Sequence, residues 1–171
     1  MIEICKLIFV IAVTVKITEA CNGYNLKVNR ISTCIDDSIV VPHNVDLKFD
    51  PNCNLIIEGC IEMVKPTKWA KGTYEANKSP MPPMKGPVDM CQILGDAKVP
   101  QAGEIISAFG LPKKCPLSAK KYCVNGKKSV NISAFKKKLT LLAGQLDLKF
   151  DVEHDSGKSC VDINITVSKR K

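Results

Sequence analysis

The chain has 171 residues, a formal net charge of +8 and nine cysteines. Its one Trp, three Tyr and five Phe leave little for base stacking, which argues against nucleic-acid binding despite the charge. Outside the first 20 residues no apolar stretch approaches the roughly 20 residues that a transmembrane helix needs. We expect most lysines to form a solvated surface, with transient contact to an anionic membrane through runs such as 136–138.

The N-terminus has the pattern of a secretory signal peptide. Lys6 precedes an apolar run over residues 7–15, and the small residue Ala20 stands directly before Cys21. We therefore expect residues 1–20 to be a signal peptide that is cleaved after Ala20, and the mature protein to be secreted or lumenal. Residues 21–171 have the length of a single domain.

Alternation of apolar and polar residues predicts strands with one buried face. It runs over residues 45–49, 146–152 and 161–167, and we expect further strands over 26–35, 55–64 and 129–135. A short polar stretch, 154–158, contains Gly157 and separates the last two alternations, so these should form an antiparallel hairpin. The predicted fold class is mostly β, a two-sheet antiparallel β-sandwich.

The middle of the chain lacks this alternation. Four prolines within residues 79–87 exclude a central strand there and predict a rigid surface loop. Residues 88–94 and 102–109 carry apolar side chains at near-helical spacing, so we expect one or two short helices.

Eight cysteines remain in the mature chain, an even number that predicts four disulfides: Cys21, Cys34, Cys53, Cys60, Cys91, Cys115, Cys123 and Cys160. A bond from Cys21 to Cys160 would tie the chain ends together, and one from Cys91 to Cys115 would pin the helical segment to the sandwich. Cys53 and Cys60 lie roughly 20 Å apart on an extended strand and should not pair. The partners of Cys34, Cys53, Cys60 and Cys123 stay open.

Two glycosylation sequons are expected to present Asn131 and Asn164 on the polar sides of their strands. No catalytic motif stands out, because both histidines, His43 and His154, fall in predicted turns where a solvated side chain is the usual case. No close Cys pair with matching His suggests a metal site. We predict a protein that is not an enzyme and has no metal and no cofactor.

Several short motifs, in this order, are similar to the ganglioside-activator branch of the ML lipid-recognition superfamily: Ile39-Val40-Val41-Pro42-His43-Asn44-Val45, Cys91-Gln92-Ile93-Leu94, Phe109-Gly110-Leu111-Pro112, Cys115-Pro116 and Gly157-Lys158-Ser159-Cys160. The resemblance covers nearly all of residues 21–171. It implies a β-cup whose splayed sheets enclose an apolar cavity for acyl chains. It also implies the Cys21–Cys160 and Cys91–Cys115 pairings.

The sequence departs from that branch at Lys113 and Lys114, which stand where the activator has a further cysteine. The ligand is therefore open between a glycolipid and a pheromone or hydrocarbon, since related arthropod proteins of this branch are associated with chemosensory tissue. We predict a secreted lipid-binding protein that holds an apolar ligand for transfer or presentation. The alternative is an extracellular protein-binding module, or a disulfide-rich inhibitor, with a filled core.

The predicted lipid-binding residues are the inward apolar positions of the strands and a group expected near the mouth of the cup. The strand positions are Val45, Leu47, Ile57, Ile61, Met63, Leu148, Phe150, Ile163 and Ile165. The mouth positions are Trp69, Ile105, Ile106 and Phe109. Inward alternation by itself is what any sandwich core shows, so the cavity depends on the resemblance.

Overall fold

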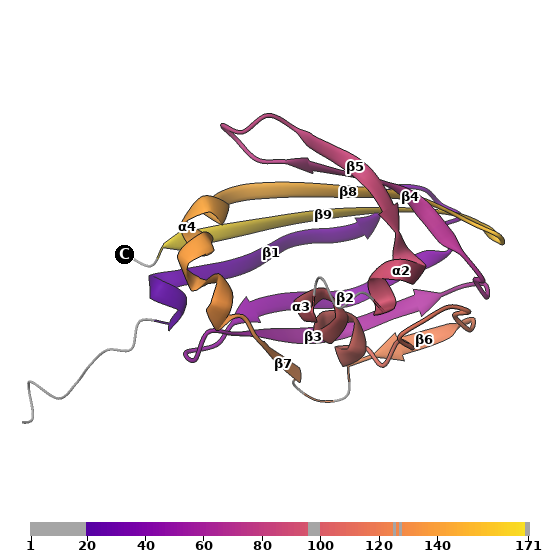
Figure 1. Ribbon diagram of the computed structural model, residues 1–171, viewed down its shortest axis with the longest axis horizontal. Helices are drawn as coiled ribbons and strands as arrows, with labels where there is room; N and C mark the ends of the chain where they lie inside the picture. The colour runs from indigo at the N-terminus through magenta and orange to yellow at the C-terminus, as the bar shows by residue number, and fades with distance from the viewer. Residues whose placement is uncertain (1–19, 96–99, 125, 127, 170–171) are drawn as a thin grey trace, which may run out of the picture.

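The protein is a two-layer antiparallel β-sandwich (Figure 1). The computed structural model describes residues 20–95, 100–124, 126 and 128–169. The predicted signal peptide lies outside these residues except for Ala20, which opens the short 3-10 helix η1 (Ala20–Gly23). The two-sheet antiparallel fold predicted from the alternation is confirmed.

The first sheet has five strands in the order β1-β9-β8-β4-β5. Their bounds are Tyr24–Thr33 (β1), Gly157–Lys169 (β9), Gly144–His154 (β8), Ala70–Asn77 (β4) and Met84–Asp89 (β5). The second sheet has the order β2-β3-β6, and β7 pairs with β3 as well. Its bounds are Val40–Phe49 (β2), Asn54–Met63 (β3), Lys120–Cys123 (β6) and Lys128–Asn131 (β7).

The predicted hairpin joins β8 to β9. His154 pairs with Gly157 at the turn, and Phe150 with Val161 further along the two strands. Both strands lie in the interior of the five-stranded sheet, flanked by β1 and β4. The strongest alternation of the sequence therefore forms the middle of the larger sheet, where one face must be apolar.

Three segments differ from expectation. The predicted loop over 79–87 gives way at Met84 to strand β5, which tolerates Pro87 because it is an edge strand. Strand β4 was not predicted because its sequence, AKGTYEAN, carries few large apolar residues. The strand expected over 129–135 ends at Asn131, whose Oδ1 accepts the Ser133 backbone N–H at 3.0 Å, and the 3-10 helix η2 (Ser133–Lys138) follows.

A β-bulge interrupts the pairing of β2 with β3 between His43 and Asp46. Asn44 adopts a φ of 49°, and the opposing Gly59 has a φ of 103°. A Cβ on Gly59 would lie 2.4 Å from the Asn44 carbonyl oxygen, so only glycine fits the close approach of the two strands.

All eight described cysteines form disulfides, which pair Cys21 with Cys53, Cys34 with Cys160, Cys60 with Cys123, and Cys91 with Cys115. The Cys91–Cys115 pairing is the expected one, but the Cys21–Cys160 pairing was wrong. Strand β1 runs antiparallel to β9, with Tyr24 opposite Lys169 and Thr33 opposite Val161. Cys21 therefore lies beside the end of β9 that is far from Cys160. Cys34, at the near end, is the disulfide partner of Cys160 instead.

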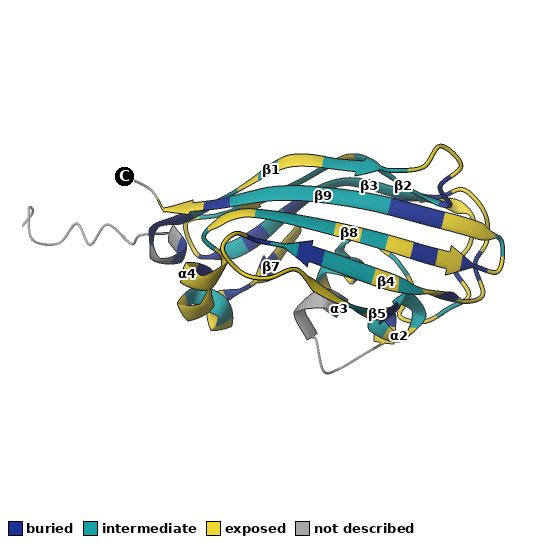
Figure 2. Cartoon of the chain, turned by 90° about the horizontal axis from the view of Figure 1, so that it is seen from above, coloured by how far each residue is buried: buried dark blue, intermediate teal, exposed yellow. Residues whose placement is uncertain are grey.

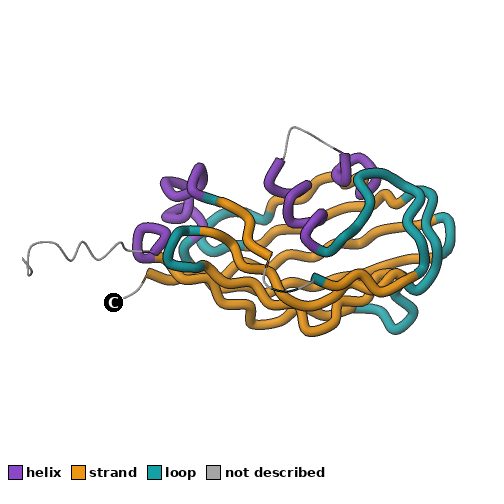
Figure 3. Tube along the Cα trace, turned by 90° about the horizontal axis from the view of Figure 1, so that it is seen from below, coloured by secondary structure: helices purple, strands orange, loops and turns teal. Residues whose placement is uncertain are grey.

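One long edge of the sandwich is closed by strands and the other by helices. Strands β1 and β2, from different sheets, pack together along the first edge. Along the second lie α2 (Met90–Gly95), α3 (Pro100–Ala108), η2 and α4 (Leu139–Leu142), as Figures 1 and 3 show. Helix α2 packs against β4 of the first sheet and α3 against β7 of the second, so this pair bridges the gap between the sheet edges.

A candidate apolar ligand cavity

The buried apolar side chains form two clusters rather than a single core. The larger contains Ile57, Met63 and Leu94 among others, and the smaller consists of Ala70, Val88 and Val152 with their half-buried neighbours. Compact domains usually have one contiguous core. Between the two clusters lies a cavity of about 240 Å³ whose wall is almost entirely apolar.

Strands of both sheets and the helical edge contribute to this cavity. Helix α2 supplies Met90 and Leu94, and α3 supplies Ile106. On the β8–β9 hairpin the inward side chains Phe150, Val161 and Ile163 line the cavity and are half-buried. Phe150 also packs against the smaller cluster. Figure 2 shows this intermediate burial along the middle of β9.

Five of the thirteen predicted residues line the cavity: Ile61, Met63, Ile106, Phe150 and Ile163. The other eight lie elsewhere. Ile57 and Phe109 belong to the packed core, and Val45, Leu47 and Ile105 pack against it. Leu148 and Ile165 are half-buried beyond the cavity, on the side away from the β8–β9 turn, and Trp69 is 43% exposed.

Ten lining residues were not predicted. Six lie on strands: Val40, Ala70, Val152, His154, Ser159 and Val161. Four lie on or beside the helices: Met90, Leu94, Leu111 and Leu117. Val152 and Val161 belong to alternations visible in the sequence, whereas Ala70, His154 and Ser159 carry no such signal because they are small or polar.

His154 is part of a buried polar chain at one end of the cavity, which corrects the expectation of a solvated turn histidine. Its side chain is 7% exposed at the end of β8. Its Nε2 lies 2.7 Å from Ser159 Oγ, and its Nδ1 lies 3.4 Å from the Oγ1 of the fully buried Thr67. Burial lowers the pKa of His154, with Asp155 opposing the shift, so the ring is neutral at neutral pH.

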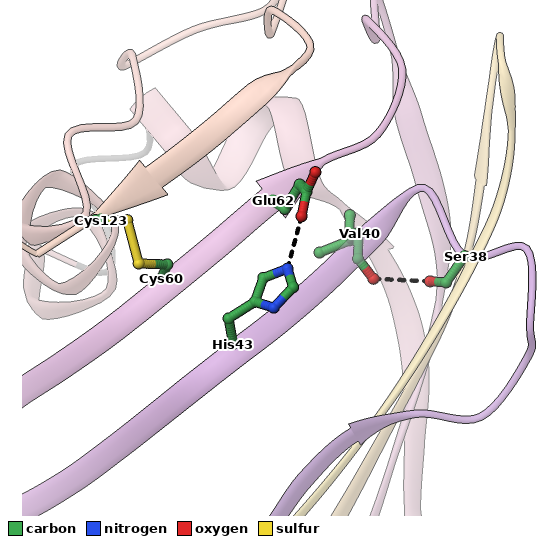
Figure 4. A network of polar contacts seen from close by, with 6 residues as sticks. All are labelled: Ser38, Val40, His43, Cys60, Glu62 and Cys123. Carbon is green, nitrogen blue, oxygen red and sulfur yellow. Dashed lines mark hydrogen bonds and ion pairs between the residues drawn. A yellow bond between two sulfur atoms is a disulfide. The ribbon is translucent and has the colours of Figure 1, made fainter.

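Ser159 connects this chain to the opposite sheet. Its Oγ accepts the Val40 backbone N–H at 3.0 Å, which joins β9 to β2 across the sandwich. Nearby, Ser38 Oγ donates to the Val40 carbonyl oxygen at 2.8 Å (Figure 4). This end of the sandwich is therefore held by hydrogen bonds in addition to the packing of the buried Ile39.

The other histidine, His43, lies within β2 and not in the expected turn. Its Nε2 is 2.6 Å from Glu62 Oε2 on the neighbouring strand, beside the Cys60–Cys123 disulfide (Figure 4). Glu62 alternates with Ile61 and Met63, which line the cavity, so the pair lies on the outer face of the second sheet. It is a cross-strand contact outside the cavity.

The two sequon asparagines differ in their surroundings. Asn131 is exposed, and its Oδ1 accepts from the Ser133 hydroxyl at 2.6 Å. Asn164 is half-buried on interior strand β9, where its Nδ2 donates to Asp147 and its Oδ1 accepts from Asn29 at 2.6 Å. The predicted solvent-facing placement thus holds fully only for Asn131.

The described residues contain neither a cluster of metal ligands nor a membrane-spanning helix. Among them no group of three or more His, Cys, Asp or Glu side chains could hold a metal ion. No helix in the same part of the chain is long and apolar enough to cross a membrane.

No family model matches the chain. The chain is similar to sporozoite-associated mosquito saliva protein 1 of Anopheles gambiae, to which it is 29% identical over 159 residues, covering 88% of this chain and 84% of the mosquito protein. Similarity to a saliva protein and the presence of four disulfides are both consistent with an extracellular protein.

Proposed function

We propose that this chain is a secreted, non-enzymatic lipid-binding protein that holds an acyl chain or a similar apolar ligand between its sheets, for transfer or presentation. The observation that carries the proposal is the apolar cavity of about 240 Å³ that separates the two core clusters. Apolar cavities of this kind exclude water and accept apolar guests. A volume of about 240 Å³ is below the roughly 300–1,000 Å³ of typical ligand pockets, which favours a single chain over a bulky lipid.

Burial of the apolar part of the ligand supplies enough free energy for binding, and no chemical step is needed. Each methylene moved from water contributes about 0.8 kcal/mol, so about ten methylenes give about 8 kcal/mol before ordering costs are subtracted. The lining residues that the structure describes carry no charged side chain, so the gain comes from apolar contact with residues such as Phe150 and Ile163.

Membership of the ML superfamily is part of this proposal. Two antiparallel sheets, an apolar cavity and the Cys91–Cys115 disulfide support it. The pairing of Cys21 with Cys53 departs from the pattern that the resemblance implied. A glycolipid, a pheromone and a hydrocarbon all stay within the proposed ligand class.

A filled sandwich that acts through its surface is the alternative, and it predicts one continuous core. The apolar cavity beside Ile61, Phe150 and Ile163 favours the lipid carrier. A disulfide-rich inhibitor, the other form of this alternative, would need a protruding rigid loop. The loop expected over 79–87 is shorter than predicted, because strand β5 begins at Met84.

Contact with an anionic membrane is the second part of the proposal, and the surface of η2 and α4 suits it best. Leu141 is 68% exposed, Leu142 is also exposed, and both follow the exposed Lys137 and Lys138. Exposed leucines beside cations favour an anionic headgroup region. The surface around Trp69 is weaker, because Lys71 Nζ lies 3.7 Å from Asp89 Oδ2 and is partly neutralised.

The experiment that tests the proposal combines native mass spectrometry of the secreted protein with binding of the apolar fluorophore 1-aminoanthracene. We expect a co-purifying lipid, or fluorophore uptake that Ala70→Phe abolishes, since Ala70 lines the cavity. Thr73→Phe is the matched control, because Thr73 is exposed on the same strand. A protein that carries no lipid and takes up no fluorophore would exclude the proposed function.

A further inference from the structure

In the described part of the chain, the cavity wall consists of thirteen apolar residues and two polar ones, His154 and Ser159. Both are buried, Ser159 with 4% exposure. Because a buried polar group without its hydrogen bonds costs about 1–3 kcal/mol, the bonds available to Ser159 can be counted one by one.

Ser159 has one donor and two acceptor positions, and within the described part of the chain its hydroxyl makes two hydrogen bonds. One lone pair accepts the Val40 N–H at 3.0 Å. The second bond, to His154 Nε2 at 2.7 Å, runs in either direction according to the histidine tautomer. If Ser159 donates to Nε2, one lone pair of Ser159 is unused. If Nε2–H donates, both lone pairs are taken and the Ser159 hydroxyl hydrogen is unused.

Either tautomer therefore leaves Ser159 with one unused hydrogen-bonding position at the cavity wall. The Ser159 side chain projects between the sheets, because its Oγ reaches Val40 on the opposite strand. A ligand hydroxyl can both donate and accept, so it satisfies Ser159 in both tautomers. A carbonyl does so in one tautomer only, and a hydrocarbon in neither.

We propose that Ser159 is the polar anchor of the cavity and selects ligands with an apolar body and a single hydroxyl group, such as long-chain alcohols. The inference rests on the proposed function and names its ligand class. A carboxylate is a poorer fit, because the described residues of the lining include no cation to compensate a buried charge.

The test compares three ligands of equal chain length, 1-decanol, decane and decanoate, by displacement of 1-aminoanthracene at neutral pH. We expect the preference for 1-decanol over decane to fall about five- to tenfold in Ser159→Ala, the size of one hydrogen bond. Ser38→Ala is the matched control: it removes another buried hydroxyl that bonds to Val40 but does not line the cavity. We expect that variant to keep the wild-type preference.

An unchanged preference in Ser159→Ala, or tighter binding of decanoate than of 1-decanol by the wild type, would overturn the inference while the proposed function stood. Absence of binding by all three ligands would overturn both.

Ser159→Ala also leaves the Val40 N–H without its acceptor, and the variant can fail to fold for that reason. The wild-type protein then supplies the test. With 1-decanol bound, the protons on the carbon that carries the hydroxyl should show nuclear Overhauser contacts to Ser159 Hβ and the His154 ring. Contacts to Leu94 and Ile106 alone would place the hydroxyl elsewhere and overturn the inference.

Discussion

Cys91, the second residue of α2, is joined by a disulfide to Cys115, which follows α3 and lies 24 residues further along the chain. This bond closes the helical segment that supplies Met90, Leu94 and Ile106 to the cavity wall. The covalent link therefore belongs to the edge of the sandwich whose helices line the cavity.

The first prediction concerns this disulfide. Cys91→Ser with Cys115→Ser should lower the free energy of unfolding by about 3 kcal/mol, and it should speed ligand release because the helices lose their tether. Stopped-flow release of 1-aminoanthracene measures the rate, and urea titration measures stability.

The matched control is Cys60→Ser with Cys123→Ser, which opens a longer loop of 63 residues on the outer face of the second sheet. It should cost about 4 kcal/mol of stability yet leave the release rate of the folded protein unchanged. Equal acceleration in both double variants would show that global stability, not the helical edge, controls release.

The second prediction concerns pH. Because burial lowers the pKa of His154, the unfolded chain takes up a proton at higher pH than the folded one. The contribution of His154 to stability is therefore complete above the ordinary histidine pKa of about 6.5 and declines as pH falls below it. Denaturant midpoints between pH 7.5 and pH 5, at steps of roughly half a unit, should show this decline, and His154→Gln should flatten it. His43→Gln retains His154 and should keep the decline.

The third prediction separates core from cavity on one strand. Ile57 is fully buried in the packed core, whereas Ile61, four residues further on β3, faces the cavity. Truncation of Ile57 to Ala should cost about 4 kcal/mol, and of Ile61 about 2 kcal/mol, because fewer neighbours lose contact around Ile61. Equal losses in urea unfolding would indicate that Ile61 is packed like an ordinary core residue.

The fourth prediction concerns membrane contact. Lys137→Gln with Lys138→Gln should weaken sedimentation with phosphatidylserine vesicles about 30-fold at low salt, at about 1 kcal/mol per lysine. Leu141→Ser should weaken it as well, since Leu141 is the most exposed large apolar residue of the surface. Trp69→Ser is the control for the other candidate surface and should bind as the wild type does; a loss confined to this variant would move the contact to β4.

The fifth prediction concerns glycans. Asn131 is exposed, whereas Asn164 lies in a hydrogen-bonded row with Asn29 and Asp147 on an interior strand. We expect higher occupancy at Asn131 than at Asn164, measured by deglycosylation in heavy-isotope water and peptide mass spectrometry. Full occupancy at Asn164 would contradict the prediction, because it would mean that the hydrogen bonds to Asn29 and Asp147 do not hinder attachment of a glycan.

Residue pattern alone determined the layers of this protein. Period-two alternation places Phe150 and Ile163 on the inner face, because neighbouring side chains on a strand must point to opposite faces. The short polar stretch around Gly157 joins their two strands as a hairpin. The even number of cysteines in residues 21–171 predicted four disulfides without knowledge of the fold, because an exported chain oxidises its thiols in pairs.

Only the tertiary structure decided what each inward side chain meets. Ile57 and Ile61 carry the same alternation, yet one is packed and the other faces a cavity, because what each meets belongs to other elements and the residue pattern of β3 does not record it. The same holds for His154, a turn residue in sequence that the antiparallel register brings beside Ser159, and for Cys160, whose partner is set by the direction of β1. Alternation fixes the side to which a residue points, and the separation and register of the two sheets fix its environment.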